Sequence, residues 1–144
     1  MKYAAALLSA ALAIGATPAA AENWNVYSTT DTSVYMVDLD TIRGTTAWTA
    51  QVSLIPEPVD EPVLITEVEV RCSDLRARLK AAFTYDEAGK NTDMLTDPSD
   101  WIAAPPGSVL ASFMRQICDN SFDPESNLGE VGPHDARNSF YNEE

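Results

Sequence analysis

The alternation of side chains between Val63 and Tyr85 constrains the fold of this chain more than any other feature. Apolar and polar residues alternate in two runs on either side of Ser73-Asp74, which predicts an antiparallel hairpin with one buried face. A two-residue turn at Ser73-Asp74 gives a register in which both faces match. Its pairs are Val70–Ala77, Val68–Leu79 and Leu64–Phe83 on the apolar face, and Glu69–Arg78 and Glu67–Lys80 on the polar face. A slip by one residue would break both sets, but this register also opposes Arg71 and Arg76, so a longer turn through Leu75 stays open.

Weaker patterns predict the rest of a sheet. Aromatic and β-branched runs and regular alternation indicate strands, while Asp, Gly and Pro indicate the connections. We expect strands at residues 24–28, 33–37, 45–55 and 92–95, a turn at 38–44 and a proline-rich loop at 56–62.

One amphipathic helix is expected late in the chain. Ser108 follows Pro105-Pro106-Gly107 and is a good N-cap. The apolar residues after it recur at helical spacing, at Leu110, Phe113, Met114 and Ile117. This pattern ends at Cys118, and residues 119–144 contain seven acidic residues and a single Arg. That composition predicts an acidic, disordered C-terminal tail, which leaves residues 22–118 as the folded domain.

The two cysteines, Cys72 and Cys118, are expected to form a buried disulfide. Strand alternation turns Cys72 toward the inner face, and helical spacing places Cys118 beside the apolar stripe. An even number of cysteines in an exported chain favours such a bond, which would tie the helix to the sheet. The alternative is a redox-active or nucleophilic pair, but active dithiols are usually close in sequence, as in C-x-x-C.

The N-terminal residues 1–21 predict a cleaved signal peptide. Lys2 supplies the positive charge, a short apolar run follows, and Ala19-Ala20-Ala21 is a typical cleavage site. The apolar run is shorter than the roughly 20 residues that a membrane-spanning helix needs. The first cysteine is Cys72, so no thiol near the cleavage site is available for lipidation. We therefore expect a periplasmic or secreted protein that is neither a lipoprotein nor membrane-anchored.

Composition excludes several classes of function. The chain has 22 acidic and 9 basic residues and a net charge of −13, which opposes binding to nucleic acids and anionic membranes. One His and two Cys cannot supply a zinc site of the finger type or the usual ligands of haem and iron–sulfur clusters. We expect no cofactor and no metal ion.

Possible catalytic residues each have a simpler interpretation. The only histidine, His134, lies in the expected tail and should be exposed. Glu67 and Glu69 share a strand face like an acid–base pair, but the basic residues expected opposite them would keep both ionised. Asp38 and Asp40 lack the spacing of a calcium loop and are expected to cap a turn.

Two groups of side chains could serve binding. The stripe of Arg76, Arg78 and Lys80 is expected to form ion pairs within the protein, with docking of an acidic partner as the alternative. Three tryptophans are expected in the core or against the helix, in preference to a sugar-binding platform. They are Trp24, Trp48 and Trp101.

A series of spaced residues runs through almost the whole expected domain. It comprises Trp24, Asp38-x-x-Thr41-Ile42, Trp48, Cys72 with Arg76 and Arg78, Tyr85 with Gly89, Trp101-Ile102-x-x-Pro105-Pro106-Gly107-Ser108 and Cys118. This order resembles the surface-adhesin protein E family. The resemblance implies an antiparallel sheet of about six strands with the terminal helix tied to its concave face, which agrees with the α+β fold expected from the residue patterns. It also implies dimer formation and adhesion to host matrix or serum proteins.

These patterns favour an exported, non-catalytic binding domain. Its partner would be a host matrix or serum protein, as the resemblance implies, or a protein of the bacterial envelope. One alternative is a small secreted hydrolase that uses acidic residues alone, which would need two carboxylates about 5–10 Å apart in a pocket. Another is a periplasmic envelope factor.

Overall fold

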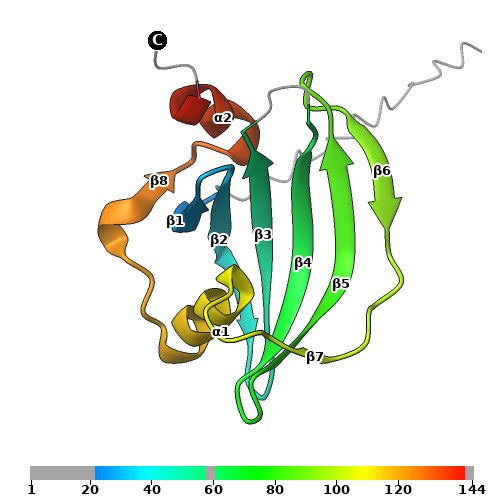
Figure 1. Cartoon of the computed structure of the whole chain (residues 1–144), viewed down its shortest axis with the longest axis vertical. Coiled ribbons are helices and arrows are strands. Elements are labelled where there is room, and N and C mark those ends of the chain that lie inside the picture. The colour runs from blue at the N-terminus through cyan, green and yellow to red at the C-terminus, as the bar shows by residue number, and fades with distance from the viewer. Residues whose placement is uncertain (1–21, 58–60, 142–144) are drawn as a thin grey trace, which may run out of the picture.

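The computed structural model describes residues 22–57 and 61–141, so the expected signal peptide lies outside the described residues. One antiparallel sheet has the strand order β6-β5-β4-β3-β2-β1-β8, and β7 also pairs with β5 (Figure 1). The elements are β1 (Trp24–Thr30), β2 (Ser33–Gly44), β3 (Trp48–Pro56), β4 (Val63–Arg71), β5 (Arg76–Tyr85), β6 (Asn91–Leu95), β7 (Ile102–Ala103), α1 (Val109–Asp119), the 3-10 turn η1 (Pro124–Ser126), β8 (Asn127–Gly129) and α2 (Pro133–Tyr141). The α+β class is confirmed, with eight strands instead of about six.

The hairpin of β4 and β5 has the expected register near its turn. Val70 faces Ala77, Glu69 faces Arg78 and Val68 faces Leu79. The register then shifts, so that Leu64 faces Thr84 and the expected pairing with Phe83 is wrong. Lys80 is the extra residue of this bulge. Ala81 and Ala82 follow it, and because small side chains favour neither face strongly, the alternation pattern could not locate the shift.

The hairpin keeps the register of the two-residue turn, in which Arg71 opposes Arg76, although the turn residues run from Cys72 to Leu75. Strand pairing ends at Arg71 and Arg76, and Leu75 adopts a left-handed conformation with φ 49°. The carboxylate of Asp74 lies 2.6 Å from Arg71 Nη2 and 3.7 Å from Arg76 Nε. It therefore offsets the repulsion between the two opposed guanidinium groups.

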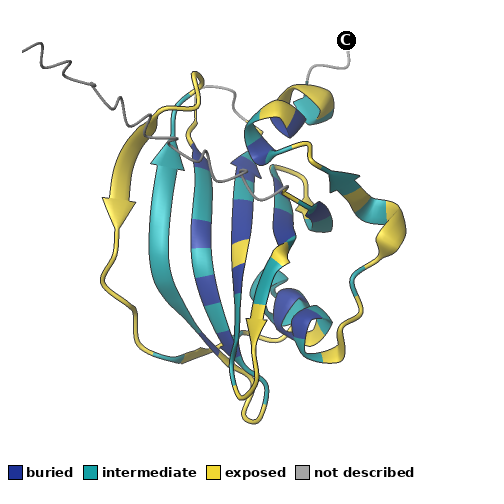
Figure 2. Ribbon diagram, turned by 180° about the vertical axis from the view of Figure 1, so that it is seen from behind, coloured by how far each residue is buried: buried dark blue, intermediate teal, exposed yellow. Residues whose placement is uncertain are grey.

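Two hydrophobic clusters lie on opposite faces of the sheet, because neighbouring residues along β2 contribute to different clusters. The α1-side core includes Val37, and the α2-side core includes Met36. Figure 2 shows buried residues concentrated in the central strands, whereas β6 is exposed along its length. The α1-side core is Val37, Ala50, Val52, Val68, Val70, Ala77, Phe113, Met114 and Ile117, and the α2-side core is Trp24, Val34, Met36, Ile55, Val63 and Ala136.

Helix α1 is held on its face as expected. The side chain of Ser108 accepts a hydrogen bond from the Ala111 N–H at 3.1 Å, which confirms the N-cap. The predicted disulfide between Cys72 and Cys118 is present, with Cα atoms 5.7 Å apart. Both cysteines are half-buried rather than fully buried. The bond joins the end of α1 to the β4–β5 turn.

The expectation that residues 119–144 form a disordered tail is wrong for the described part of that segment. After α1 the chain forms η1, adds β8 to β1, and then forms α2, which packs against β3. Ala136 and Arg137 are buried. The acidic side chains of this segment, among them Asp123, Glu125 and Asp135, lie on its exposed side, so a high content of acids is compatible with docking.

Candidate functional site

The candidate site is the part of the α2-side face that α2 leaves uncovered. Strand pairing places Glu69, Thr49 and Arg43 side by side on this face, with Glu67 and Gln51 in the next row. We call this region the polar shelf and define it by the residues Thr41, Arg43, Thr49, Gln51, Glu67, Glu69, Arg71, Arg76, Arg78 and Lys80. Within the same face, the sheet changes from an apolar core under α2 to an open polar surface.

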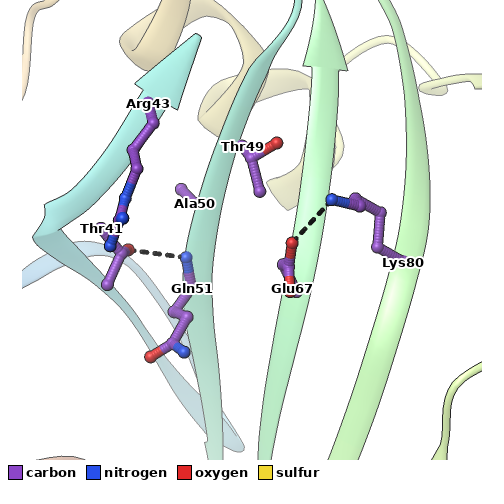
Figure 3. Close-up of a pocket in the computed structure, with 7 residues that line it drawn as sticks. All are labelled: Thr41, Arg43, Thr49, Ala50, Gln51, Glu67 and Lys80. Carbon is purple, nitrogen blue, oxygen red and sulfur yellow. Dashed lines mark hydrogen bonds and ion pairs between the residues drawn. The ribbon is translucent and has the colours of Figure 1, made fainter.

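An open pocket of about 390 Å³ lies in the shelf (Figure 3). Its lining comprises Thr41, Arg43, Thr49, Ala50, Gln51, Glu67 and Lys80. Its size falls near the lower end of the range usual for ligand pockets. The pocket is open to solvent and mostly polar, which suits contact with a larger partner more than enclosure of a small molecule.

One wall of the pocket is an irregular stretch of β2. The pairing passes from Asp38–Gln51 directly to Arg43–Thr49, so β2 has extra residues at this point. Thr41 Oγ1 accepts the Gln51 N–H at 2.8 Å and donates to the Asp38 carbonyl at 2.7 Å, which replaces part of the strand ladder. The expected turn at residues 38–44 is therefore wrong: the segment is a bulged continuation of the strand, and the bulge displaces Thr41 and Arg43.

The expected charge pairs cross the shelf. Glu69 Oε2 accepts from Arg78 Nε at 2.6 Å, and Glu67 Oε1 accepts from Lys80 Nζ at 2.8 Å. Both pairs are partly exposed, so each contributes at most about 1 kcal/mol to stability. Their main consequence is that both carboxylates are already bound to cations of the same surface.

Trp101 lies over arginines at one end of the shelf. The ring centroid is 4.5 Å from the guanidinium carbon of Arg71 and 4.8 Å from that of Arg78. The expected core role holds for Trp24, which is buried, and for Trp48, which packs against the α1-side core. For Trp101 it is wrong, since its ring orders two cations of the shelf.

The carboxyl group of Asp74 lies in the β4–β5 turn beside the shelf, between Arg71 and Arg76. The hydrogen bond from Arg71 lowers the pKa of Asp74, against a smaller opposing effect of desolvation. The same bond raises the pKa of Arg71. A general acid needs the opposite shift in its carboxyl pKa, so this pair is suited to holding the turn and not to transferring protons.

The remaining candidate residues lie away from the shelf or are already engaged. Asp38 is buried, and its Oδ1 accepts the N–H groups of Asn23 and Asp40 at 3.0 and 3.1 Å, which confirms backbone capping. His134 is half-buried at the start of α2, close to Gly89, so the expectation of full exposure is wrong. Within residues 22–57 and 61–141, no group of three or more His, Cys, Asp or Glu residues could hold a metal ion.

The sequence predicted part of the shelf. The opposition of charges in the hairpin identified Glu67, Glu69, Arg78 and Lys80, and the polar side of the third strand included Thr49 and Gln51. Arg43 and Thr41 were missed because residues 38–44 have the composition of a turn. No periodic signal links Trp101 to Arg71, since their contact depends on how the loop after β6 crosses the end of the sheet.

No helix of the described part of the chain is long and apolar enough to cross a membrane. The disulfide is compatible with an exported protein. No protein-family model, curated protein or solved structure matches this chain. Any function is therefore inferred from the chemistry of the shelf.

Proposed function

We propose that this protein is an exported, non-catalytic binding domain and that the polar shelf is its contact surface. The observation that carries the proposal is the uneven cover of one sheet face: α2 buries one part, and the shelf beside it stays open and lined by ordered charged groups. Ion pairs and the Trp101 contacts fix several of these groups in advance, which reduces the entropy lost on binding. A rigid sheet also suits recognition better than a mobile loop.

The shelf does not support the alternative of a hydrolase that uses acidic residues alone. Such an enzyme needs one carboxyl group kept protonated by an apolar environment and another kept ionised. Glu67 and Glu69 are instead each bound to a cation on an open surface. The guanidinium groups of Arg71 and Arg78 lie over the Trp101 ring.

Export belongs to the proposal as well. The disulfide fits an oxidising compartment, and the pattern of residues 1–21 fits a cleaved signal peptide. The partner would be a host matrix or serum protein, or a protein of the bacterial envelope. Dimer formation, implied by the resemblance to protein E, is compatible with a free shelf on each copy.

A blocking substitution tests this proposal. Gln51 is exposed in the middle of the pocket, so Gln51→Trp should fill the shelf without breaking an ion pair. The matched control is Arg115→Trp, an exposed position on α1 at the opposite face. Protein exported by a bacterial host would be immobilised and exposed to periplasmic and host-matrix extracts, with retained proteins identified by mass spectrometry.

We expect the unchanged protein and Arg115→Trp to retain the same proteins, and Gln51→Trp to lose them. Equal retention by all three would show that the shelf is not the contact surface. Turnover of a glycoside or ester substrate that disappears in Glu67→Gln would replace the binding proposal with the hydrolase.

A further inference from the structure

We infer that the polar shelf recognises a short acidic segment of a partner protein, with two carboxylates about four residues apart in an extended chain. This inference rests on the proposed binding function and specifies the chemistry of the partner. It is carried by the charge distribution of the molecule and by the placement of two cations across the pocket.

The charge distribution is strongly asymmetric. The whole chain carries −13, yet five of its nine basic residues lie on the shelf: Arg43, Arg71, Arg76, Arg78 and Lys80. The carboxylates that form ion pairs with them are Glu67, Glu69 and Asp74, while Asp38 is buried and bound to backbone N–H groups. The shelf is thus a local positive region in an acidic protein, and such a region attracts and orients an anionic group.

The five cations differ in their availability. Arg71 and Arg78 are engaged by Asp74, Glu69 and the Trp101 ring. Arg76 lies 3.7 Å from the Asp74 carboxylate and donates to the Trp101 carbonyl at 3.4 Å. Arg43 is exposed and forms no ion pair with any residue of the described chain. Lys80 donates to Glu67 in a partly exposed contact. Because an ammonium has three N–H donors, Lys80 can also donate to a second carboxylate. Arg43 and Lys80 are therefore the cations best placed to bind an incoming acid.

The positions of these two cations set the spacing of the ligand. Arg43 lies on β2 and Lys80 on β5, with β3 and β4 between them, and both line the same pocket. Three strand-to-strand steps of about 4.8 Å place them roughly 14 Å apart across the sheet. An extended peptide rises about 3.3 Å per residue, so side chains at i and i+4 share one side and lie roughly 13 Å apart. Two carboxylates at this spacing would reach both cations.

The groups between the cations suit a peptide backbone. The side chains of Thr49 and Gln51 line the floor of the pocket, and Figure 3 shows them between Arg43 and the Glu67–Lys80 pair. A hydroxyl and a carboxamide can each donate to a carbonyl and accept from an N–H. A long polyanion fits less well, because beyond the shelf it would meet the negative surface that makes the chain −13 overall. The ligand is therefore short and locally acidic.

The test uses a fluorescent seven-residue peptide with Glu at positions 2 and 6 and Ser or Thr elsewhere. Binding to the full-length exported protein is measured by anisotropy at low and at physiological ionic strength. The double variant Arg43→Gln/Lys80→Gln removes the two cations of the pocket. The double variant Lys90→Gln/Arg115→Gln removes two exposed cations outside the shelf and changes the net charge equally.

We expect saturable binding that weakens with salt, a loss of at least about tenfold in affinity for the shelf variant, and a change below about twofold for the control. A peptide with Gln in place of both Glu should not bind. Moving the second Glu from position 6 to position 4 should weaken binding, because the two carboxylates then no longer reach both cations.

Three results would overturn the inference. They are no peptide binding at low salt, equal losses in both double variants, and displacement of the peptide by a short heparin fragment that binds more tightly. If the peptide fails to bind while Gln51→Trp still abolishes capture from extracts, the proposed function stands and only the acidic specificity is wrong. If Gln51→Trp leaves capture from extracts unchanged and Arg43→Gln/Lys80→Gln leaves peptide affinity unchanged, both the proposed function and the acidic specificity are wrong.

Discussion

The two helices cover opposite faces of one sheet and are attached in different ways. Helix α1 buries Phe113, Met114 and Ile117 and is joined to the sheet by the disulfide. Helix α2 has no covalent link, and its deeply buried residues include the charged Arg137. Arg137 Nη2 donates to the Glu61 and Pro56 carbonyls, and the Tyr141 hydroxyl donates to the Ile55 carbonyl.

This contrast explains why one helix was visible in the sequence and the other was not. An apolar stripe at helical spacing indicates that a helix packs on a hydrophobic surface, and it can be recognised without knowing which surface that is. Hydrogen bonds from a side chain to distant carbonyls leave no periodic trace. A segment can therefore look like a solvated tail and still complete the core.

Removal of α2 should have the largest effect. Deletion of residues 132–144 would uncover Met36, Ile55 and Val63, which are almost fully buried. Since full burial of each such side chain contributes about 1.5–3 kcal/mol, the loss in unfolding free energy should be on the order of 5 kcal/mol. Thermal unfolding followed by circular dichroism measures it, with Ser139→Ala on the exposed side of α2 as the control. A decrease in Tm of less than about 5 °C would show that α2 does not stabilise the sheet.

Removal of the disulfide should have the next largest effect. Cys72→Ala with Cys118→Ala opens a loop of 46 residues, for which chain entropy predicts a cost of roughly 4 kcal/mol. Hydrogen exchange should show α1 amides losing protection first while α2 amides keep theirs. Denatured, unreduced protein should contain no free thiol. Loss of protection in α2 before α1 would contradict independent attachment of the two helices.

Replacement of Arg137 tests the polar attachment of α2. Arg137→Met keeps much of the apolar stem but removes the donors to the Glu61 and Pro56 carbonyls. Bonds from a charged donor contribute about 1.5–3 kcal/mol, so we expect a loss of roughly 2 kcal/mol. Urea unfolding measures it, with the exposed Arg115→Met as the matched control. An equal change in both variants would mean that general charge, and not these bonds, matters.

The smallest effect should appear at alkaline pH on the α1 side. Tyr27 packs 5.0 Å from the Phe113 ring, and burial, helped by nearby Tyr35, raises the pKa of Tyr27 above its usual value. The folded state thus favours neutral Tyr27, so its contribution is complete below the unfolded pKa of about 10 and decreases as pH rises above it. Urea denaturation at pH 8 and at pH 11 gives the unfolding free energy at each pH. The decrease between the two should be smaller in Tyr27→Phe than in the unchanged protein, by on the order of 1 kcal/mol. Identical pH dependence would show that Tyr27 ionises freely in the folded state.

The sequence also contains a signal for the second covered face. Val63-Leu64-Ile65 and Val34-Tyr35-Met36-Val37 are continuous apolar runs, which are typical of strands buried on both faces. Strict alternation near Glu67 and Glu69 marks the place where one face opens to solvent. The boundary between covered core and polar shelf was thus encoded locally, although the element that covers the core was not identified.

Features that depend on local periodicity could be predicted from the sequence alone. These are the hairpin register beside its turn, the Ser108 cap, the apolar stripe of α1 and, through the two inward positions, the disulfide. The signal peptide and the partner remain predictions from residue patterns and from the resemblance.

The path of the chain after α1 and the position of the shelf depend on contacts between distant residues. The Asn25 amide donates to the Asp123 carbonyl 98 residues away, and the Tyr141 hydroxyl reaches Ile55 across 86 residues. The bulge that places Arg43 on the pocket likewise depends on Thr41 replacing a ladder bond to β3. Each of these contacts joins one polar group to one particular backbone atom across a long sequence separation. Such contacts produce no repeating pattern in the sequence, so they could not be predicted from it.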